Sequence, residues 1–120
     1  MARFSRLILF TLVMTAAILA VQAQTQEAIA LRCDCSGTVD AFQYPDTWVA
    51  SQSFGFTNGW EPSQSLCQDV CWSDAVNTAA SLCNSYGLHG GVGFVWIDWH
   101  FTYDLFTTGG NSSQYDCDAF

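Results

Sequence analysis

The spacing of the cysteines constrains the fold of this chain more than any other feature. Cys67 and Cys71 are four residues apart, so on a helix they lie one turn apart on the same face. Cys33 and Cys35 are two residues apart, so on a strand they also point to one side. Both separations are about 6 Å, which allows two parallel disulfides. We therefore expect Cys33 and Cys35 to be joined to Cys67 and Cys71, bridging a helix to the first strand.

The stretch that contains the second cysteine pair, residues 65–87, has the pattern of a helix. Ser65 and Gln68 have the spacing of a capping box. Ala75, Ala79 and Ala80 favour helix in the rest of the stretch. Gly87 suits the left-handed residue that follows a helix end. We expect this helix to be the main one of the domain.

The first 23 residues have the features of a secretory signal peptide. Two arginines precede an apolar run over residues 7–21, and Val21-Gln22-Ala23 is a small-residue cleavage pattern. The run of about 15 residues is shorter than the roughly 20 that a membrane-spanning helix needs. We therefore expect residues 24–120 to form a single extracellular domain without a membrane anchor.

All six cysteines lie within residues 24–120, and an even number in a short secreted chain indicates three disulfides. On a helix Cys83 is rotated about 160° from Cys67, so it needs a different partner, and Cys117 is the one left. Zinc binding by the other four cysteines is the alternative, but an oxidising compartment favours disulfides. We expect neither a metal nor another cofactor.

The charge of the chain excludes several kinds of partner. The sequence contains three lysine and arginine residues and eleven aspartate and glutamate residues, and Arg32 is the only one of the three outside the leader. Binding a nucleic-acid backbone requires clustered basic side chains. Nucleic acids and anionic membranes are therefore poor partners, and we expect a monomer that acts on a protein or glycan target.

Apolar and polar residues alternate in several segments, as in strands. The first predicted strand is residues 29–35, and Ser36-Gly37 ends it. The next segment alternates less regularly, and we expect a short helix or extended piece near 47–53 and a strand near 53–57. The strongest alternation is in residues 92–108, which are long enough to be bent or split. One face of this run is predicted to be core, and it carries Val95, Ile97, Trp99, Phe101, Tyr103 and Leu105.

The C-terminal residues are expected to form a turn over 107–113 and a last strand, with Tyr115, Cys117 and Ala119 facing inward. The predicted fold is α+β: a small disulfide-stabilised domain with one main helix packed on an antiparallel sheet of three to five strands. Asn111-Ser112-Ser113 is a glycosylation sequon, which fits an exposed loop at Asn111 in a secreted protein.

Residues that could bind or react lie on the more polar face of the long strand. Asp98 and His100 share this face, and a carboxylate beside an imidazole can orient a general base or help to bind a metal. Trp96 lies on the same face and is a candidate for an exposed binding residue. Because no GxSxG or HExxH motif accompanies them, we expect a binding role and no catalytic residues.

The chain resembles the small secreted cysteine-rich proteins of filamentous fungi, the effector-type group that includes killer-toxin-like α/β sandwiches. The resemblance lies in the leader, the Cys33-Asp34-Cys35 strand, the helix with Cys67, Cys71 and Cys83, and the glycine-rich exit into a long strand. It implies release into a host or competitor environment and action by binding. The alternatives are a carbohydrate-binding or wall-associated module and a small secreted hydrolase that uses His100 and Asp98.

Overall fold

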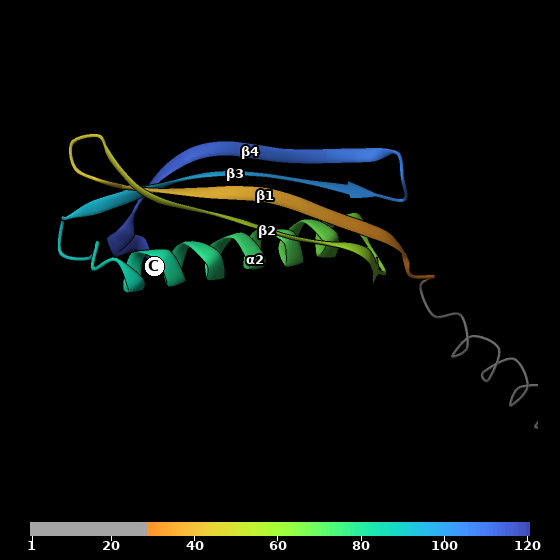
Figure 1. The fold of residues 1–120 in the computed structure, drawn as a ribbon. Helices are drawn as coiled ribbons and strands as arrows, with labels where there is room; N and C mark the ends of the chain where they lie inside the picture. The colour runs from red at the N-terminus through yellow and green to blue at the C-terminus, as the bar shows by residue number, and fades with distance from the viewer. Residues whose placement is uncertain (1–28) are drawn as a thin grey trace, which may run out of the picture.

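Four strands and one long helix account for most of residues 29–120, the part of the chain that the computed structural model describes (Figure 1). The elements are β1 (Leu31–Gln43), β2 (Thr47–Glu61), α2 (Gln64–Ser85), β3 (Gly93–Tyr103), β4 (Thr107–Asp116) and the 3-10 turn η1 (Cys117–Ala119). The strand order is β2-β1-β3-β4, and all neighbouring strands are antiparallel. The predicted α+β fold is confirmed. The predicted leader, residues 1–23, lies outside the described residues.

Strand β1 is the centre of the sheet together with β3, and it is longer than the sequence pattern predicted. The prediction ended it at Ser36-Gly37, but β1 continues to Gln43 because β2 and β3 both pair with it beyond that point. Glycine is required at position 37, where a Cβ atom would collide with the Asp98 carbonyl and the Phe54 ring. Gly37, which the sequence pattern suggested as the end of the strand, therefore allows close packing inside it.

Strand β2 is continuous from Thr47 to Glu61. Of the two alternatives for 47–53, the extended piece is therefore confirmed and the short helix is wrong, and the strand expected at 53–57 is one part of a longer strand. Pairing with β1 organises the whole segment, and it absorbs the turn-forming pair Asn58-Gly59 at a register shift opposite Cys33 and Cys35. Asn58 has a φ of 59°, a left-handed conformation that asparagine tolerates better than most residues.

Helix α2 begins at Gln64, and its N-cap lies two residues before the predicted one. The Ser63 hydroxyl accepts a hydrogen bond from the Leu66 amide at 3.2 Å, so Ser63 is the N-cap and the predicted capping box at Ser65 is wrong. The predicted end is confirmed: Gly87 has a φ of 64°, and the amides of Gly87 and Leu88 donate to the Asn84 and Cys83 carbonyls. These two bonds form a Schellman motif.

The C-terminal third forms a hairpin, with its turn earlier than predicted. Asp104 and Leu105 both have positive φ (55° and 63°), as the two central residues of a type I′ turn require, and Phe106 completes the three-residue connection to β4. Leu105 is 59% exposed, so its predicted core position is wrong. The predicted turn at 107–113 is strand β4, and η1 replaces the end of the predicted last strand. Hydrogen bonding to β3 overrides the turn preference of the Gly109-Gly110 pair.

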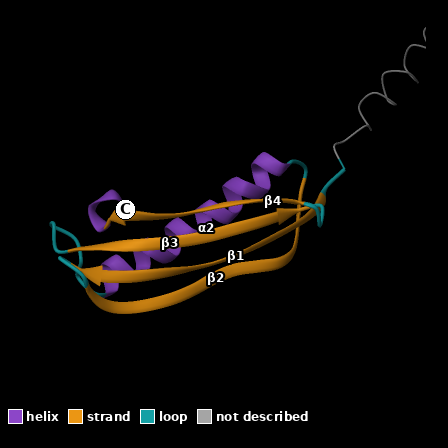
Figure 2. Ribbon diagram, turned by 90° about the horizontal axis from the view of Figure 1, so that it is seen from above, coloured by secondary structure: helices purple, strands orange, loops and turns teal. Residues whose placement is uncertain are grey.

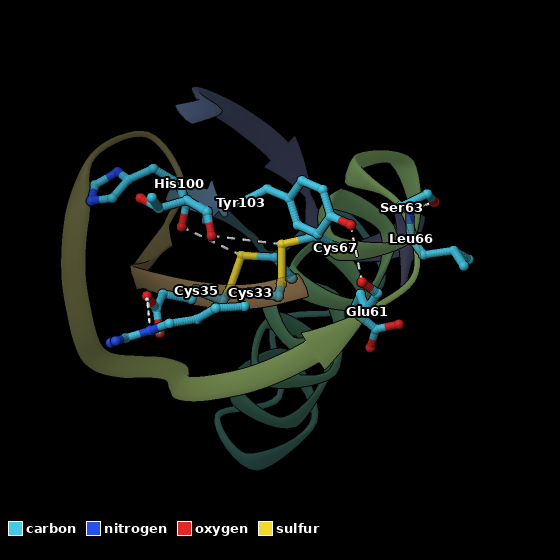
Figure 3. Close-up of a disulfide and its surroundings, with 12 residues drawn as sticks. Cys33, Cys35, Glu61, Ser63, Leu66, Cys67, His100 and Tyr103 are labelled. Atoms are coloured by element: carbon cyan, nitrogen blue, oxygen red, sulfur yellow. Dashed lines mark hydrogen bonds and ion pairs between the residues drawn. A yellow bond between two sulfur atoms is a disulfide. The ribbon is translucent and has the colours of Figure 1, made fainter. Parts of the chain in front are cut away.

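Three disulfides connect the two layers, in the pairing expected from the spacing. Cys33 is joined to Cys67, Cys35 to Cys71 and Cys83 to Cys117, with Cα–Cα distances of 5.4 to 5.7 Å. Figure 3 shows the Cys33–Cys67 bridge below the Tyr103 ring, whose hydroxyl donates to the Glu61 carbonyl at 3.0 Å. The core lies around these bridges, between α2 and the sheet. Its fully buried aliphatic side chains include Val39, Val95 and Ile97.

Candidate functional site

Helix α2 covers one face of the sheet and leaves the opposite face uncovered within residues 29–120 (Figures 1 and 2). We call this uncovered side the open face. Because side chains alternate along a strand, every second residue of β1 and β3 lies on it. In β3 the burial alternates accordingly: Val95, Ile97 and Trp99 are buried, whereas Trp96 and Asp98 are exposed. Cross-strand pairs of the open face join Phe42 to Phe94, Asp40 to Trp96, Thr38 to Asp98 and Ser36 to His100.

Five aromatic side chains gather where β1 ends and β3 begins. We call them the aromatic end: Phe42, Tyr44, Trp48, Phe94 and Trp96. The Phe42 and Phe94 rings stack at a centroid distance of 5.1 Å, and the Tyr44 ring lies 4.9 Å from Phe94. Trp48 lies across from Phe42 on β2 and is 59% exposed, and Trp96 is 41% exposed. Phe94 is itself buried, so the exposed apolar surface of the aromatic end is formed by Tyr44, Trp48 and Trp96.

Hydrogen bonds along the sheet hold the two exposed indoles of the aromatic end. The Trp96 Nε1–H donates to the Ser112 hydroxyl at 2.8 Å, which ties the ring to β4. The Trp48 Nε1–H donates to the Ser51 hydroxyl at 3.0 Å, and that hydroxyl donates to Asp40. Both indole N–H groups already have a hydrogen-bond partner, and these bonds restrict rotation of the rings. The apolar faces of the rings can therefore bind a partner at a small cost in side-chain entropy.

Sequence reasoning identified Trp96 but missed the other members of the aromatic end. Phe42, Tyr44 and Trp48 lie in the segment whose secondary structure was least readable. The β1–β3 pairing places Phe42 beside Phe94, and the β1–β2 pairing places Trp48 beside Phe42. The usable signal was the number of aromatic residues, since the chain has five tryptophans and four tyrosines. Such a number in a small domain indicates exposed rings, but it does not tell which rings are exposed.

Asp98 and His100 both lie on the open face, as their spacing predicted. They line an open hollow of about 430 Å³ beside the two glycines of β4, Gly109 and Gly110. Among the described residues, no hydrogen bond or ion pair joins the His100 ring to Asp98 or to a hydroxyl group. In Figure 3 the His100 ring points away from the disulfides. The two residues share a surface without forming the oriented pair that a general base requires.

Carboxylates surround the aromatic end with little compensating positive charge. Arg32 forms an ion pair with Asp34, with Nε and Oδ2 2.9 Å apart, toward the other end of β1. Asp40 and Asp98 have no cationic partner among the described residues. Asp116 accepts a hydrogen bond from the Tyr44 hydroxyl at 3.0 Å, and this bond raises the pKa of Tyr44. The open face is therefore acidic as well as aromatic.

The second carboxylate of the Asp116-Cys117-Asp118 segment binds the chain's own glycine-rich loop. Asp118 accepts hydrogen bonds from the backbone amides of Gly90 and Gly91, at 2.6 and 2.9 Å. These bonds, together with the nearby His89, lower the pKa of Asp118. The loop amides that could have bound an external anion are therefore occupied by a carboxylate of the same chain.

Asn111 is on strand β4, at the edge of the sheet, and not in the loop that the sequence suggested. It is exposed and lies across from Trp99, so its side chain belongs to the helix side of the sheet and not to the open face. The neighbouring Ser112 is on the open face, where it holds Trp96. The alternation of the strand thus separates the sequon asparagine from the aromatic end.

Within residues 29–120, no group of three or more histidine, cysteine, aspartate or glutamate side chains is placed to hold a metal ion. The same residues contain no helix of the length and apolarity needed to cross a bilayer. Comparison with protein-family models, curated proteins and solved structures finds no match to this chain.

Proposed function

We propose that this protein is a secreted effector or toxin-like protein that binds a host or competitor target without catalysing a reaction. The aromatic end of the open face is its binding surface. The observation that carries the proposal is the aromatic end, where hydrogen bonds hold the exposed indoles of Trp48 and Trp96 beside the carboxylates of Asp40 and Asp98. Exposed aromatic rings that are already ordered are typical anchors of protein interfaces.

Charge complementarity indicates the chemistry of the target. The described residues contain a single arginine and no lysine, and that arginine is paired with Asp34. A basic protein surface would be attracted by the remaining carboxylates and would meet the apolar rings at the same place. We therefore propose a positively charged protein as the partner. Its binding should weaken as salt is added, because exposed charges are screened.

The non-catalytic part of the proposal is supported by the arrangement of the titratable groups. Within residues 29–120 no carboxylate orients the His100 ring, and the His89 ring is hydrogen-bonded to Asn84 at 2.8 Å. All six cysteines are bridged, so none supplies a thiolate nucleophile. A His100→Ala variant that lost a hydrolytic activity of the wild type would contradict this part of the proposal.

Tryptophan variants test the binding surface, and the chain supplies its own control. Trp48→Ala and Trp96→Ala remove rings from the aromatic end. Trp60→Ala removes an equally exposed indole (64%) at the opposite end of β2. Binding to immobilised basic probes, such as histone and poly-arginine, is measured by surface plasmon resonance at two salt concentrations.

We expect the first two substitutions to weaken binding at least tenfold, the loss usual for an interface anchor, and Trp60→Ala to leave it unchanged. Equal losses for all three variants, or binding that is insensitive to salt, would contradict the proposed surface. Circular dichroism confirms that each variant is folded.

A second candidate function is binding to carbohydrate in a cell wall. It is favoured by the indoles of Trp48 and Trp96, because their exposed faces could stack on sugar rings while nearby carboxylates accept hydrogen bonds from hydroxyl groups. Sedimentation with insoluble chitin, cellulose and β-glucan distinguishes the two candidates. Salt-independent retention on one polysaccharide, lost in Trp96→Ala, would replace the protein target by a glycan.

A further inference from the structure

A second hollow lies on the helix side of the sheet, and it is distinct from the open face. It has a volume of about 240 Å³ and lies between α2 and the edge strand β4. We call it the side hollow. Its lining combines aromatic rings with hydrogen-bonding groups: Gln68, Asp69, Trp72, Trp99, Asn111 and Tyr115. The volume is below the range of pockets that enclose drug-sized ligands, so it suits a smaller group such as one or two sugar rings.

The aromatic floor of the side hollow is held by contacts between the rings. The Trp72 ring lies 5.5 Å from the Trp99 ring and 5.5 Å from the Tyr115 ring, between centroids. Tyr115 also meets Phe120, at 6.2 Å. Trp72 and Tyr115 are only half-buried, so part of each ring faces outward. Nothing in the described chain covers these outward parts.

The sequon asparagine stands at the rim of the side hollow. Asn111 and Tyr115 are four residues apart on one strand, so they lie on the same face, about 14 Å apart. A glycan linked to Asn111 Nδ2 is therefore attached at the rim of the side hollow, and it reaches Tyr115 only beyond its first sugar. The Asn111 Oδ1 accepts a hydrogen bond from the Ser112 amide at 2.8 Å, which leaves Nδ2 as the free end of the side chain.

We propose that Asn111 carries an N-linked glycan whose first sugars pack into the side hollow, against Trp72 and Tyr115. The apolar face of N-acetylglucosamine stacks on the rings, and Gln68 and Asp69 bind its polar groups. The glycan also covers the outer edge of β4, where unpaired backbone groups would otherwise template pairing with another strand. Because Asn111 belongs to the helix side, the glycan leaves the open face free.

The experiment uses protein secreted from yeast, so that the sequon meets the glycosylation machinery. Intact mass and peptide mapping measure occupancy at Asn111. One portion is then trimmed by endoglycosidase H to a single N-acetylglucosamine, and another is fully deglycosylated. We expect full removal to lower the melting temperature of the intact glycoprotein by about 4 to 8 °C, and the trimmed form to melt between the other two because a single sugar reaches only part of the side hollow. An unoccupied Asn111 would overturn the proposal, and so would equal melting temperatures for all three forms.

Variants of Trp72 test whether the stabilisation comes from stacking. Trp72→Phe keeps an aromatic ring, and Trp72→Leu keeps an apolar side chain without one. We expect full deglycosylation to lower the melting temperature of Trp72→Phe by at least half the wild-type shift, and that of Trp72→Leu by less than 1 °C. A full-sized shift in Trp72→Leu would show that the glycan acts elsewhere. If Trp72→Leu does not fold, the comparison of trimmed and fully deglycosylated wild type still decides the proposal.

Discussion

Removing the disulfides one at a time should show that the three bridges contribute unequally, although they close loops of similar length. The sequence separations are 34 for Cys33–Cys67, 36 for Cys35–Cys71 and 34 for Cys83–Cys117. Taken alone, each would stabilise the fold by about 3.8 kcal/mol in the chain-entropy model. The first two bridges are neighbours, however, and that changes what each adds to the other.

Once Cys33–Cys67 is formed, the second bridge closes only a small additional ring. That ring contains three residues of β1 (33–35) and five of α2 (67–71), so about eight residues in all. The same model gives about 2.5 kcal/mol for a loop of eight. The Cys83–Cys117 bridge has no such neighbour and keeps its full contribution. Removing it should therefore cost about 1.3 kcal/mol more than removing one bridge of the pair.

The assay is urea unfolding of three variants in which both cysteines of one bridge are replaced by alanine. The substitution is chemically the same in each, and all six cysteines are buried, so the loss of the sulfur atoms is matched. Free energies of unfolding come from linear extrapolation. We expect the Cys83→Ala/Cys117→Ala variant to be the least stable of the three. Removing both neighbouring bridges together should cost about 6.3 kcal/mol, more than the sum of about 5 for the two single removals.

The reasoning would be refuted if the loss of Cys35–Cys71 alone were as large as the loss of Cys83–Cys117. It would also be refuted if the two neighbouring bridges behaved additively, because additivity would mean that each closes its own long loop. Either result would show that enthalpy or residual structure in the unfolded chain, and not loop closure, governs the effect of these bridges.

Two further predictions concern other parts of the fold. The Asp118 carboxyl group should titrate below the ordinary value near 4 in an NMR titration, because amides of Gly90 and Gly91 bind its charged form. The charged carboxylate of Asp118 should contribute fully to the free energy of unfolding at pH values above that ordinary pKa, and the contribution should be lost as the pH falls through the lowered pKa. An Asp118→Asn variant whose stability fell with acid in the same way as the wild type would contradict this. Gly37→Ala should lower the free energy of unfolding by about 1 to 3 kcal/mol, measured by urea denaturation, because its methyl group would collide with the Asp98 carbonyl; an unchanged value would contradict the close packing.

Local patterns were sufficient where a single period governed the segment. The buried residues Val95, Ile97 and Trp99 of β3 follow the alternation of a strand with one covered face. Gly87 ends α2 because a left-handed residue is needed there, and that requirement is local. The same kind of reasoning failed at Leu105, where the alternation continued in the sequence but the chain turned.

Segments with turn-forming residues were misread because their partners decided their structure. Asn58-Gly59 and Gly109-Gly110 would favour turns in isolation, yet both pairs lie within strands that are paired to β1 and β3. The candidate binding surface depends on the same long-range pairing. Trp48 lies beside Phe42 because β2 folds back along β1, and Tyr44 meets Phe94 because β3 pairs with the other side of β1.

The sequence by itself determined the framework of this protein: cysteines spaced by two and by four residues match only when a strand lies along a helix. Periodicity also determined which side of β3 is buried. Only the tertiary structure decided which aromatic rings are exposed together, and on which side of the sheet Asn111 lies. The physical reason is that spacing and alternation act within one element, whereas strand register joins residues far apart in the chain.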